Sequence, residues 1–175
     1  MLRLIEVIDT PEGQAAAPRP ALTLTLSFED RRRSRLRARL VDGDEVALFL
    51  PRGSRLRDGA WLRAEGGGPT VLVRATAETL SVAATPDPHL LARAAYHLGN
   101  RHVPLQVGQG WVAYQHDHVL DDLARALGLA LTTKTAPFEP EGGGYEHDAH
   151  HHHGAHHHDG HDHGHDHGND HDHDR

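Results

Sequence analysis

The segment at residues 146–175 limits the fold more than any other feature of the sequence. From His147 onward its only hydrophobic residues are Ala149 and Ala155, and the rest is almost entirely His, Asp and Gly. A folded domain is stabilised mainly by the burial of apolar side chains, which this segment lacks. We therefore expect a globular body within residues 1–145 and a tail that is disordered without metal.

The charged residues divide at the same point. Residues 1–145 carry 17 basic and 17 acidic side chains, whereas residues 146–175 carry 1 basic and 8 acidic, so the net charges are 0 and −7. A balanced body has no general attraction to nucleic acid or to an anionic membrane, and an acidic tail repels both. Neither is an expected partner.

Several classes of protein are excluded by what the sequence lacks. It has no cysteine, which rules out disulfides, thiolate metal sites and thiol catalysis. No stretch is long and apolar enough for a membrane span, and the short first apolar run is interrupted by Arg3 and Glu6, unlike a signal peptide. The sequence also contains no Gly-rich phosphate loop and no nucleophile motif. We expect a cytoplasmic protein that is not an enzyme.

Residues 1–76 contain short strand signals separated by turn residues, which predicts an all-β domain. Asp42 and Gly43 form a dipeptide that tolerates positive φ and favours a hairpin, and residues 66–69, Gly-Gly-Gly-Pro, mark another turn. The predicted strands are LRLIEVI, ALTLTLSF, RLRARLV, EVALFLP, WLRAE and TVLVRA.

Residues 77–138 show a different pattern, with two helical segments among four strand signals. The first helix follows the strand TLSVAA, with Asp87 as its cap, Pro88 in its first turn and Gly99 at its end. The strands HVPLQV and GWVAYQ come next, then a helix that ends at Gly128, and finally the strand LALTTKTAPF. The apolar face of the second helix comprises Val119, Leu120, Leu123 and Leu127.

This β-α-β-β-α-β order is the pattern of ferredoxin-like domains. The fold class is therefore α+β: an all-β domain, a ferredoxin-like domain and a His-rich tail at residues 139–175.

The tail is a candidate metal-binding segment, because imidazole suits borderline divalent ions at neutral pH. It holds 14 of the 19 histidines, with 7 interleaved Asp. At three to six ligands per ion, it has room for roughly two to four ions, with poor selectivity among metals. An expression tag is the alternative, although tags are usually uninterrupted blocks. The candidate ligands are His147, His150, His151, His152, His153, His156, His157, His158, His161, His163, His165, His167, His171 and His173.

Five further histidines lie in the body. His116 and His118 flank Asp117 just before a helix, so on an extended segment their imidazoles would face the same side. Alternatively, Asp117 or His118 only caps that helix. His97 lies near a helix end, where a dipole contact is the simpler explanation. His89 reads as a surface residue, and His102, at the start of a predicted strand, reads as structural when taken alone.

Two segments change this interpretation. AAYHLGNRHVPLQV (residues 94–107) and HDHVLDDLARALG (residues 116–128) resemble the signature segments of the UreE family, the urease accessory nickel metallochaperones. RSRLRARLVDGDEVALFLPRG (residues 33–53) resembles that family's amino-terminal domain, and a variable His-rich tail is typical of many members.

The resemblance implies a homodimer with a partner-binding β domain at residues 1–76 and a metal-binding domain at 77–138. By position, His102 corresponds to the principal ligand at the dimer interface, and His116 and His118 correspond to secondary ligands. The role of His97 is less defined. The implied cargo is Ni(II), and Zn(II) or Cu(II) would also suit these ligands. The implied partners are the urease apoprotein and its accessory complex, reached through the GTPase accessory protein.

Two other functions compete with nickel delivery. A storage or detoxification protein for nickel or zinc would use the tail alone. A zinc hydrolase would need fixed ligands and a general base, for which Asp117 between two histidines is the only indication.

The run RRRSRLRAR is open to three interpretations. Arg35, Arg37 and Arg39 alternate with apolar residues, which favours a half-exposed strand. Docking to an acidic partner is second, and nucleic-acid binding is third because the body is neutral and no aromatic residues are interleaved.

Overall fold

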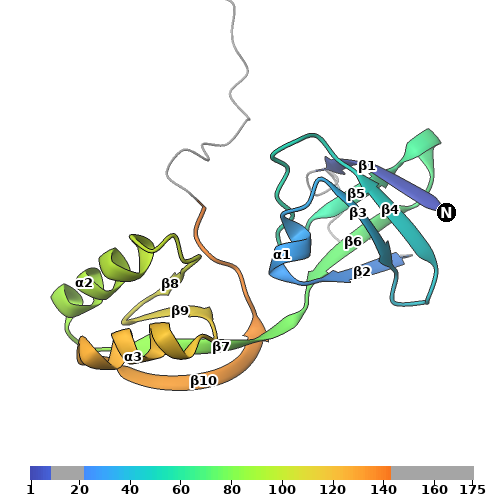
Figure 1. Cartoon of the computed structure of the whole chain (residues 1–175). Helices are drawn as coiled ribbons and strands as arrows, with labels where there is room; N and C mark the ends of the chain where they lie inside the picture. Colours follow the sequence, from blue (N-terminus) through green and yellow to red (C-terminus); the bar gives the residue numbers. More distant parts are fainter. Residues whose placement is uncertain (9–21, 143–175) are drawn as a thin grey trace, which may run out of the picture. The chain divides into compact units, whose positions relative to one another are not determined.

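The computed structural model describes residues 1–8 and 22–142. The histidines of the predicted tail, and the expectation that the tail is disordered, lie outside the described residues. Figure 1 shows two sheets, one formed by the strands up to β6 and one by β7 to β10. Within the described ranges, no helix has the length and hydrophobicity to cross a membrane.

The first sheet has six strands in the order β2-β6-β5-β1-β4-β3. β1 is parallel to β4 and β2 is parallel to β6, whereas the remaining pairs are antiparallel. A backbone hydrogen bond from Val41 N to Thr23 O joins the two outer strands near one end, so the sheet is nearly closed. Its strands are β1 (Leu2–Ile8), β2 (Leu22–Leu26), β3 (Arg35–Arg39), β4 (Glu45–Phe49), β5 (Trp61–Ala64) and β6 (Thr70–Ala75).

The alternating pattern of these strands produces one apolar interior. Leu4, Leu24, Val46, Leu62 and Val73 come from five different strands, and each is fully buried in the same cluster. The two predicted turns are confirmed: Gly43 has φ 103°, and Gly66 and Gly67 have positive φ within the short 3-10 helix η1 (Glu65–Gly67). Such values favour glycine because it has no Cβ to clash.

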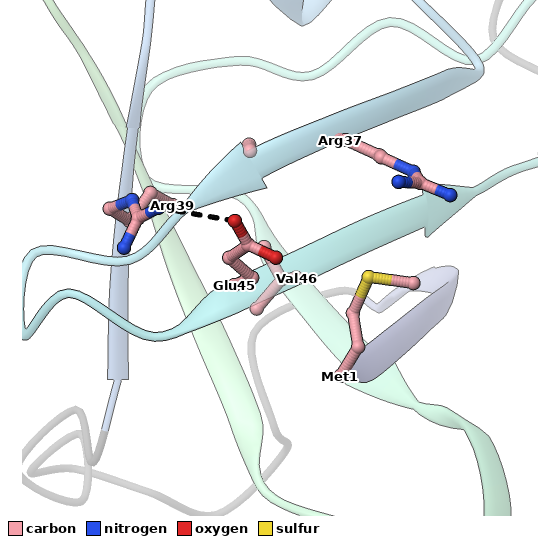
Figure 2. A pocket seen from close by; sticks show the side chains of 6 residues that line it. Met1, Arg37, Arg39, Glu45 and Val46 are labelled. Atoms are coloured by element: carbon pink, nitrogen blue, oxygen red, sulfur yellow. Dashed lines mark hydrogen bonds and ion pairs between the residues drawn. The ribbon is translucent and has the colours of Figure 1, made fainter.

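The second part of the arginine run, residues 35–39, forms the half-exposed strand that was predicted. Arg35, Arg37 and Arg39 are exposed along β3, and Leu36 and Ala38 between them are half-buried. Figure 2 shows Arg37 and Arg39 on this strand, beside β4. β3 lies at one edge of the strand order.

The all-β description of the first domain is incomplete, because a short helix, α1 (Phe28–Arg31), follows β2. Ser27 caps it by accepting a hydrogen bond from Asp30 N. The strand prediction extended through Phe28, since apolar alternation does not reveal where the chain turns away from the sheet.

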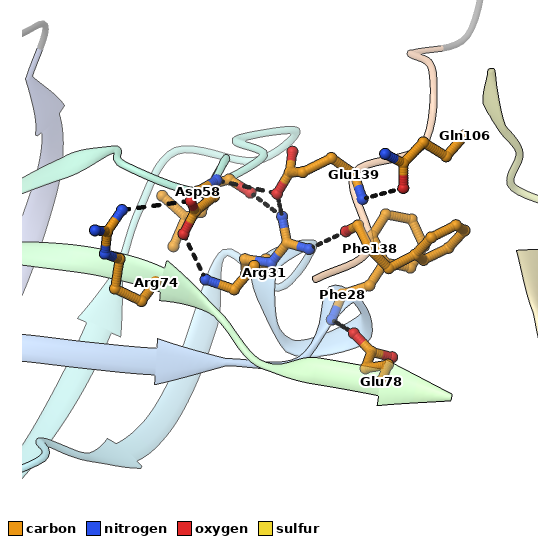
Figure 3. Close-up of polar contacts among 10 residues, drawn as sticks. Phe28, Arg31, Asp58, Arg74, Glu78, Gln106, Phe138 and Glu139 are labelled. Atoms are coloured by element: carbon orange, nitrogen blue, oxygen red, sulfur yellow. Dashed lines mark hydrogen bonds and ion pairs between the residues drawn. The ribbon is translucent and has the colours of Figure 1, made fainter. Parts of the chain in front are cut away.

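α1 also contributes to a second set of contacts, which includes Arg31. The Arg31 side chain is only 2% exposed. Its guanidinium donates to the carbonyl oxygens of Leu56 and Phe138 and to the carboxylate of Glu139 (Figure 3). The Phe28 and Phe138 rings pack edge to face, with centroids 5.2 Å apart. Leu80 completes this small apolar cluster.

The second sheet has four antiparallel strands in the order β10-β7-β9-β8. Its elements are β7 (Ala77–Ala84), α2 (Pro88–Gly99), β8 (Gln106–Gly108), β9 (Trp111–Gln115), α3 (His118–Ala126) and β10 (Ala130–Pro137), so the predicted order of strands and helices is confirmed. Ala94 and Leu98 of α2 and Ala124 of α3 are buried with Val112 and Tyr114 of β9.

The first of the two helices begins at the predicted residues, and the second is capped by Asp117, one of the two candidate caps. Asp87 accepts a hydrogen bond from His89 N, and Pro88 occupies the first position of α2. Asp117 caps α3 by accepting from Val119 N and Leu120 N, and Gly128 follows its end with φ 95°. Asp is a strong N-cap because its carboxylate satisfies amides that have no partner in the first turn.

α2 ends at Gly99, as predicted, with a cap at Asn100, and the left-handed residue that follows is His102, with φ 58°. Two details of the prediction are wrong. His102 does not begin a strand, because β8 starts only at Gln106; Pro104 has no N–H for a strand ladder and a fixed φ. Val119, placed on the apolar face of α3, is 60% exposed.

Candidate metal centre

His102 lies in the turn after α2, and its side chain is exposed. Its amide donates to Gly99 O at 2.8 Å, which closes the turn, and its φ of 58° falls in the left-handed region. This conformation is uncommon for residues other than glycine, and it costs about 1 kcal/mol. The backbone of the turn is therefore defined, and it leaves the imidazole exposed to solvent.

His97 occupies the last turn of α2 and is half-buried. Its ring packs edge to face against Tyr96, with centroids 5.4 Å apart, and its carbonyl oxygen accepts from Arg101. These contacts give His97 a role in the helix end. His89 is exposed in the first turn of α2, as predicted.

His116 is the best-supported imidazole in the body. Its Nδ1 lies 2.9 Å from Ser81 Oγ and 3.3 Å from Asp121 Oδ2, and its side chain is 46% exposed. An ionised carboxylate only accepts hydrogen bonds, so the contact with Asp121 favours a proton on Nδ1. The lone pair of the neutral ring is then on Nε2, which is the arrangement seen in metal-ligating histidines supported by a carboxylate.

Asp121 is held in turn by Tyr114. Asp121 is 3% exposed, and its Oδ1 accepts from Tyr114 OH at 2.9 Å. Burial, followed by the hydrogen bond to Asp121, raises the pKa of Tyr114 well above its usual value, so the phenol keeps its proton and remains a donor. Ser81, Tyr114 and Asp121 thus fix the orientation of His116.

The sequence did not predict that Ser81, Tyr114 and Asp121 would support His116. Ser81 comes from β7, Tyr114 from β9 and Asp121 from α3, and only the register of the sheet brings them together. The available signal is the position of Asp121, which is three residues before Ala124 and so shares the buried face of α3.

Asp117 has a structural role. Its carboxylate accepts from two amides of the first turn of α3, and those hydrogen bonds lower its pKa. The feature that pointed to a zinc hydrolase is therefore a helix cap. His118 is the first residue of α3 and is exposed.

Within residues 1–8 and 22–142, no three His, Asp or Glu side chains are arranged to hold one metal ion. His102 follows α2, whereas His116 and His118 border α3, so the three predicted body ligands come from two turns of the second domain. Each imidazole is accessible, and His116 is also oriented.

The comparisons with known proteins decide the family. The family model described as "UreE urease accessory protein, N-terminal domain" matches residues 3–76. The family model described as "UreE urease accessory protein, C-terminal domain" matches residues 78–173. This chain belongs to the UreE family.

Relatives in the UreE family span most of the chain, and each is named urease accessory protein UreE. The protein from Alkalilimnicola ehrlichii is 58% identical over 130 residues, covering 74% of this chain and 78% of its own length. That from Pseudomonas putida W619 is 55% identical over 128 residues, covering 73% and 80%. That from Vibrio parahaemolyticus is 46% identical over 160 residues, covering 87% and 100%. The family name designates an accessory protein of urease.

Proposed function

We propose that this chain is a nickel metallochaperone that binds Ni(II) and delivers it for assembly of the urease metallocentre. Membership of the UreE family supports a role in urease maturation. The structural observation that carries the metal function is His116, whose Nδ1 is engaged by Ser81 and Asp121 while Nε2 is left to a metal. Nickel titration combined with urease activation in cells tests the proposal.

In this proposal the body and the tail have different tasks. The 14 tail histidines collect Ni(II), and Zn(II) or Cu(II) would compete for them. His102, aided by His116 and His118, holds the ion that is transferred. The chemistry is ligand exchange, which requires no covalent step, so the protein acts as a chaperone and not as an enzyme.

A homodimer would complete the transfer site. One imidazole holds a divalent ion weakly, but a residue near a two-fold axis meets its own copy, which doubles the ligand set. Tyr96 on α2 is 67% exposed and Val119 on α3 is 60% exposed. Their burial between two copies would stabilise such a dimer.

The domain boundaries and partners form part of the same proposal. Residues 77–138 form a ferredoxin-like metal-binding domain, and residues 1–76 form a domain that binds a partner. The partners are the urease apoprotein and its accessory complex, reached through the GTPase accessory protein in the cytoplasm.

Truncation after Gly144 should remove most of the nickel capacity and leave the body folded. The removed segment contains 14 of the 19 histidines, with room for roughly two to four ions, and its only hydrophobic residues are Tyr145, Ala149 and Ala155. Calorimetric titration should show the loss of stoichiometry, and the thermal midpoint of the metal-free protein should be unchanged. Equal stoichiometry in the two forms would contradict the reservoir role.

Asp121→Asn should weaken nickel binding by the truncated protein about tenfold, because the amide no longer enforces the Nδ1 proton of His116. Asp122→Asn is the matched control, since Asp122 is an exposed neighbour whose one ion pair within residues 1–8 and 22–142 is with Arg125. Titration of the two truncated variants compares the affinities. Equal losses would mean that the orientation of His116 is unimportant.

A storage protein is the second candidate, favoured by the number of histidines in the tail. It differs from the chaperone in its prediction for His102, because storage by the tail alone does not require any histidine of the body.

A further inference from the structure

The arginine row, Arg35, Arg37 and Arg39, occupies every second position of β3 with its side chains exposed. β3 is the last strand in the order of the first sheet, and β4, seen beside it in Figure 2, is its one paired strand among the described residues. The hydrogen bond from Val41 N to Thr23 O lies beyond the end of β3. Within residues 1–8 and 22–142, the other edge of β3 is therefore open along the arginine row.

The register with β4 decides which backbone groups point to this edge. Leu50 N donates to Ser34 O and Leu40 N donates to Asp44 O, so the even positions of this segment form hydrogen-bonded pairs with β4. In an antiparallel ladder such pairs alternate with pairs that exchange no hydrogen bonds. The arginine row lies at the odd positions, so its N–H and C=O groups point away from β4 and toward the open edge.

The side chains along this edge are cationic on one face of the sheet and apolar on the other. Arg39 pairs with Glu45 at 3.1 Å, but both side chains are 65% exposed, and such pairs contribute little. Arg37 makes no ion pair with another described residue. On the opposite face, Leu36 and Ala38 are half-buried against the core of the first sheet. A strand added at this edge would therefore meet guanidiniums on its outer face and apolar side chains on its inner face.

We propose that the open edge of β3 binds an extended acidic segment of a partner protein as an additional strand. The segment alternates Asp or Glu with apolar residues, so its main chain pairs with the arginine row while its carboxylates lie beside the guanidiniums. Charged side chains on an edge strand discourage pairing with uncharged strands, so the row selects a partner of opposite charge. The inference rests on the proposed partner-binding role of residues 1–76, and its test uses no nickel, so its failure is distinguishable from a failure of nickel delivery.

Amide hydrogen exchange in the full-length, metal-free protein separates main-chain pairing from attraction between charges. The probe is the capped peptide Thr-Asp-Val-Asp-Val-Asp-Thr. In the free protein, the amides of the arginine row should exchange rapidly, whereas those of Leu36 and Ala38, which pair with β4, should exchange slowly. At about 90% saturation with the peptide, exchange of the arginine-row amides should slow about tenfold, because only the unbound tenth still exchanges. About 0.5 M salt should weaken the binding.

Two control peptides test the charge and its spacing. Replacement of every Asp by Asn should weaken the binding about tenfold to a hundredfold, because each exposed ion pair contributes about twofold to fivefold. The peptide Thr-Val-Asp-Asp-Asp-Val-Thr has the same charge and composition but lacks the alternation. It should give little protection, because neighbouring residues of a strand point to opposite faces.

Substitutions in the protein test the side chains and the backbone of β3 separately. Glutamine at every position of the arginine row should abolish the protection at the same peptide concentration. The control combines Arg63→Gln, Arg93→Gln and Arg125→Gln, which are exposed arginines elsewhere, and should retain it. Arg37→Pro tests the backbone, because proline is tolerated on the free side of an edge strand but has no N–H. The peptide should bind Arg37→Pro more weakly than Arg37→Gln.

Three results would overturn the proposal. The first is a failure of the alternating peptide to bind, or binding that leaves the arginine-row amides unprotected. The second is slow exchange of these amides in the free protein, which would show that the edge is already occupied, by a second copy if the protection rises with protein concentration. The third is equal protection by a DNA oligonucleotide of the same charge, which would make the arginine row a general surface for polyanions.

Discussion

His102→Ala is expected to abolish most urease activation at limiting nickel, while lowering the total nickel capacity only slightly. The substitution removes one imidazole of 19. In a two-fold dimer, however, it removes both ligands of a shared site, and with them the tightest binding. Tail truncation after Gly144 is expected to do the reverse, with a large loss of capacity and a milder loss of activation.

The measurement is urease activity in cells grown at low nickel, with both variants at matched expression. If His102→Ala activates urease as well as the unmodified protein and truncation abolishes activation, the tail itself transfers the nickel that activates urease. The storage alternative would then be favoured if body substitutions also left cellular nickel use unchanged.

A second substitution separates the ligand from the backbone conformation. Alanine is unfavourable at φ 58°, whereas asparagine tolerates left-handed φ and has no imidazole. His102→Asn should therefore keep the stability of the parent within about 1 kcal/mol and still lose activation. Full activation by His102→Asn would show that only the shape of the turn matters.

Arg31→Met is expected to lower the free energy of unfolding by about 3 kcal/mol. The methionine fills similar space but removes the donor to the carbonyl oxygens of Leu56 and Phe138. The Glu139 carboxylate loses its ion pair and keeps the hydrogen bond from Asp58 N (Figure 3). Because Arg31 is 2% exposed, water cannot readily replace it.

Urea unfolding followed by tryptophan fluorescence measures this loss. Trp61 lies in β5 and Trp111 in β9, so a Trp→Phe substitution at either one leaves a reporter in a single sheet. Arg33→Met is the control, because Arg33 is exposed and its one ion pair in the described part of the chain is with Asp30, so a change within about 0.5 kcal/mol is expected. Equal stability of the two variants would contradict a structural role for Arg31.

The features that local chemistry dictates were predictable. Asp87 and Asp117 mark the starts of two helices because their carboxylates accept amide hydrogens within three residues. Gly43 and Gly128 mark turns because only glycine adopts their positive φ at no steric cost. The alternation along β3 likewise indicated which of its side chains are exposed.

The errors occurred where a neighbouring segment overrides the local pattern. Phe28 continued an apolar strand pattern, yet it belongs to a helix whose ring packs on Phe138, more than a hundred residues away. Val119 had helical spacing with the core residues but lies at the first turn of α3, beyond the edge of the packed face.

The sequence by itself determined the family, the order of strands and helices in the second domain, and the identity of the candidate ligands, since each depends on residue type and spacing. The tertiary structure alone decided how those ligands are held. The register of β7 and β9 and the docking of α3 place Ser81 and Asp121 at Nδ1 of His116, and Tyr114 at Asp121. Hydrogen bonds require atoms within about 3 Å, and for residues 35 positions apart only the assembled sheet can provide that proximity.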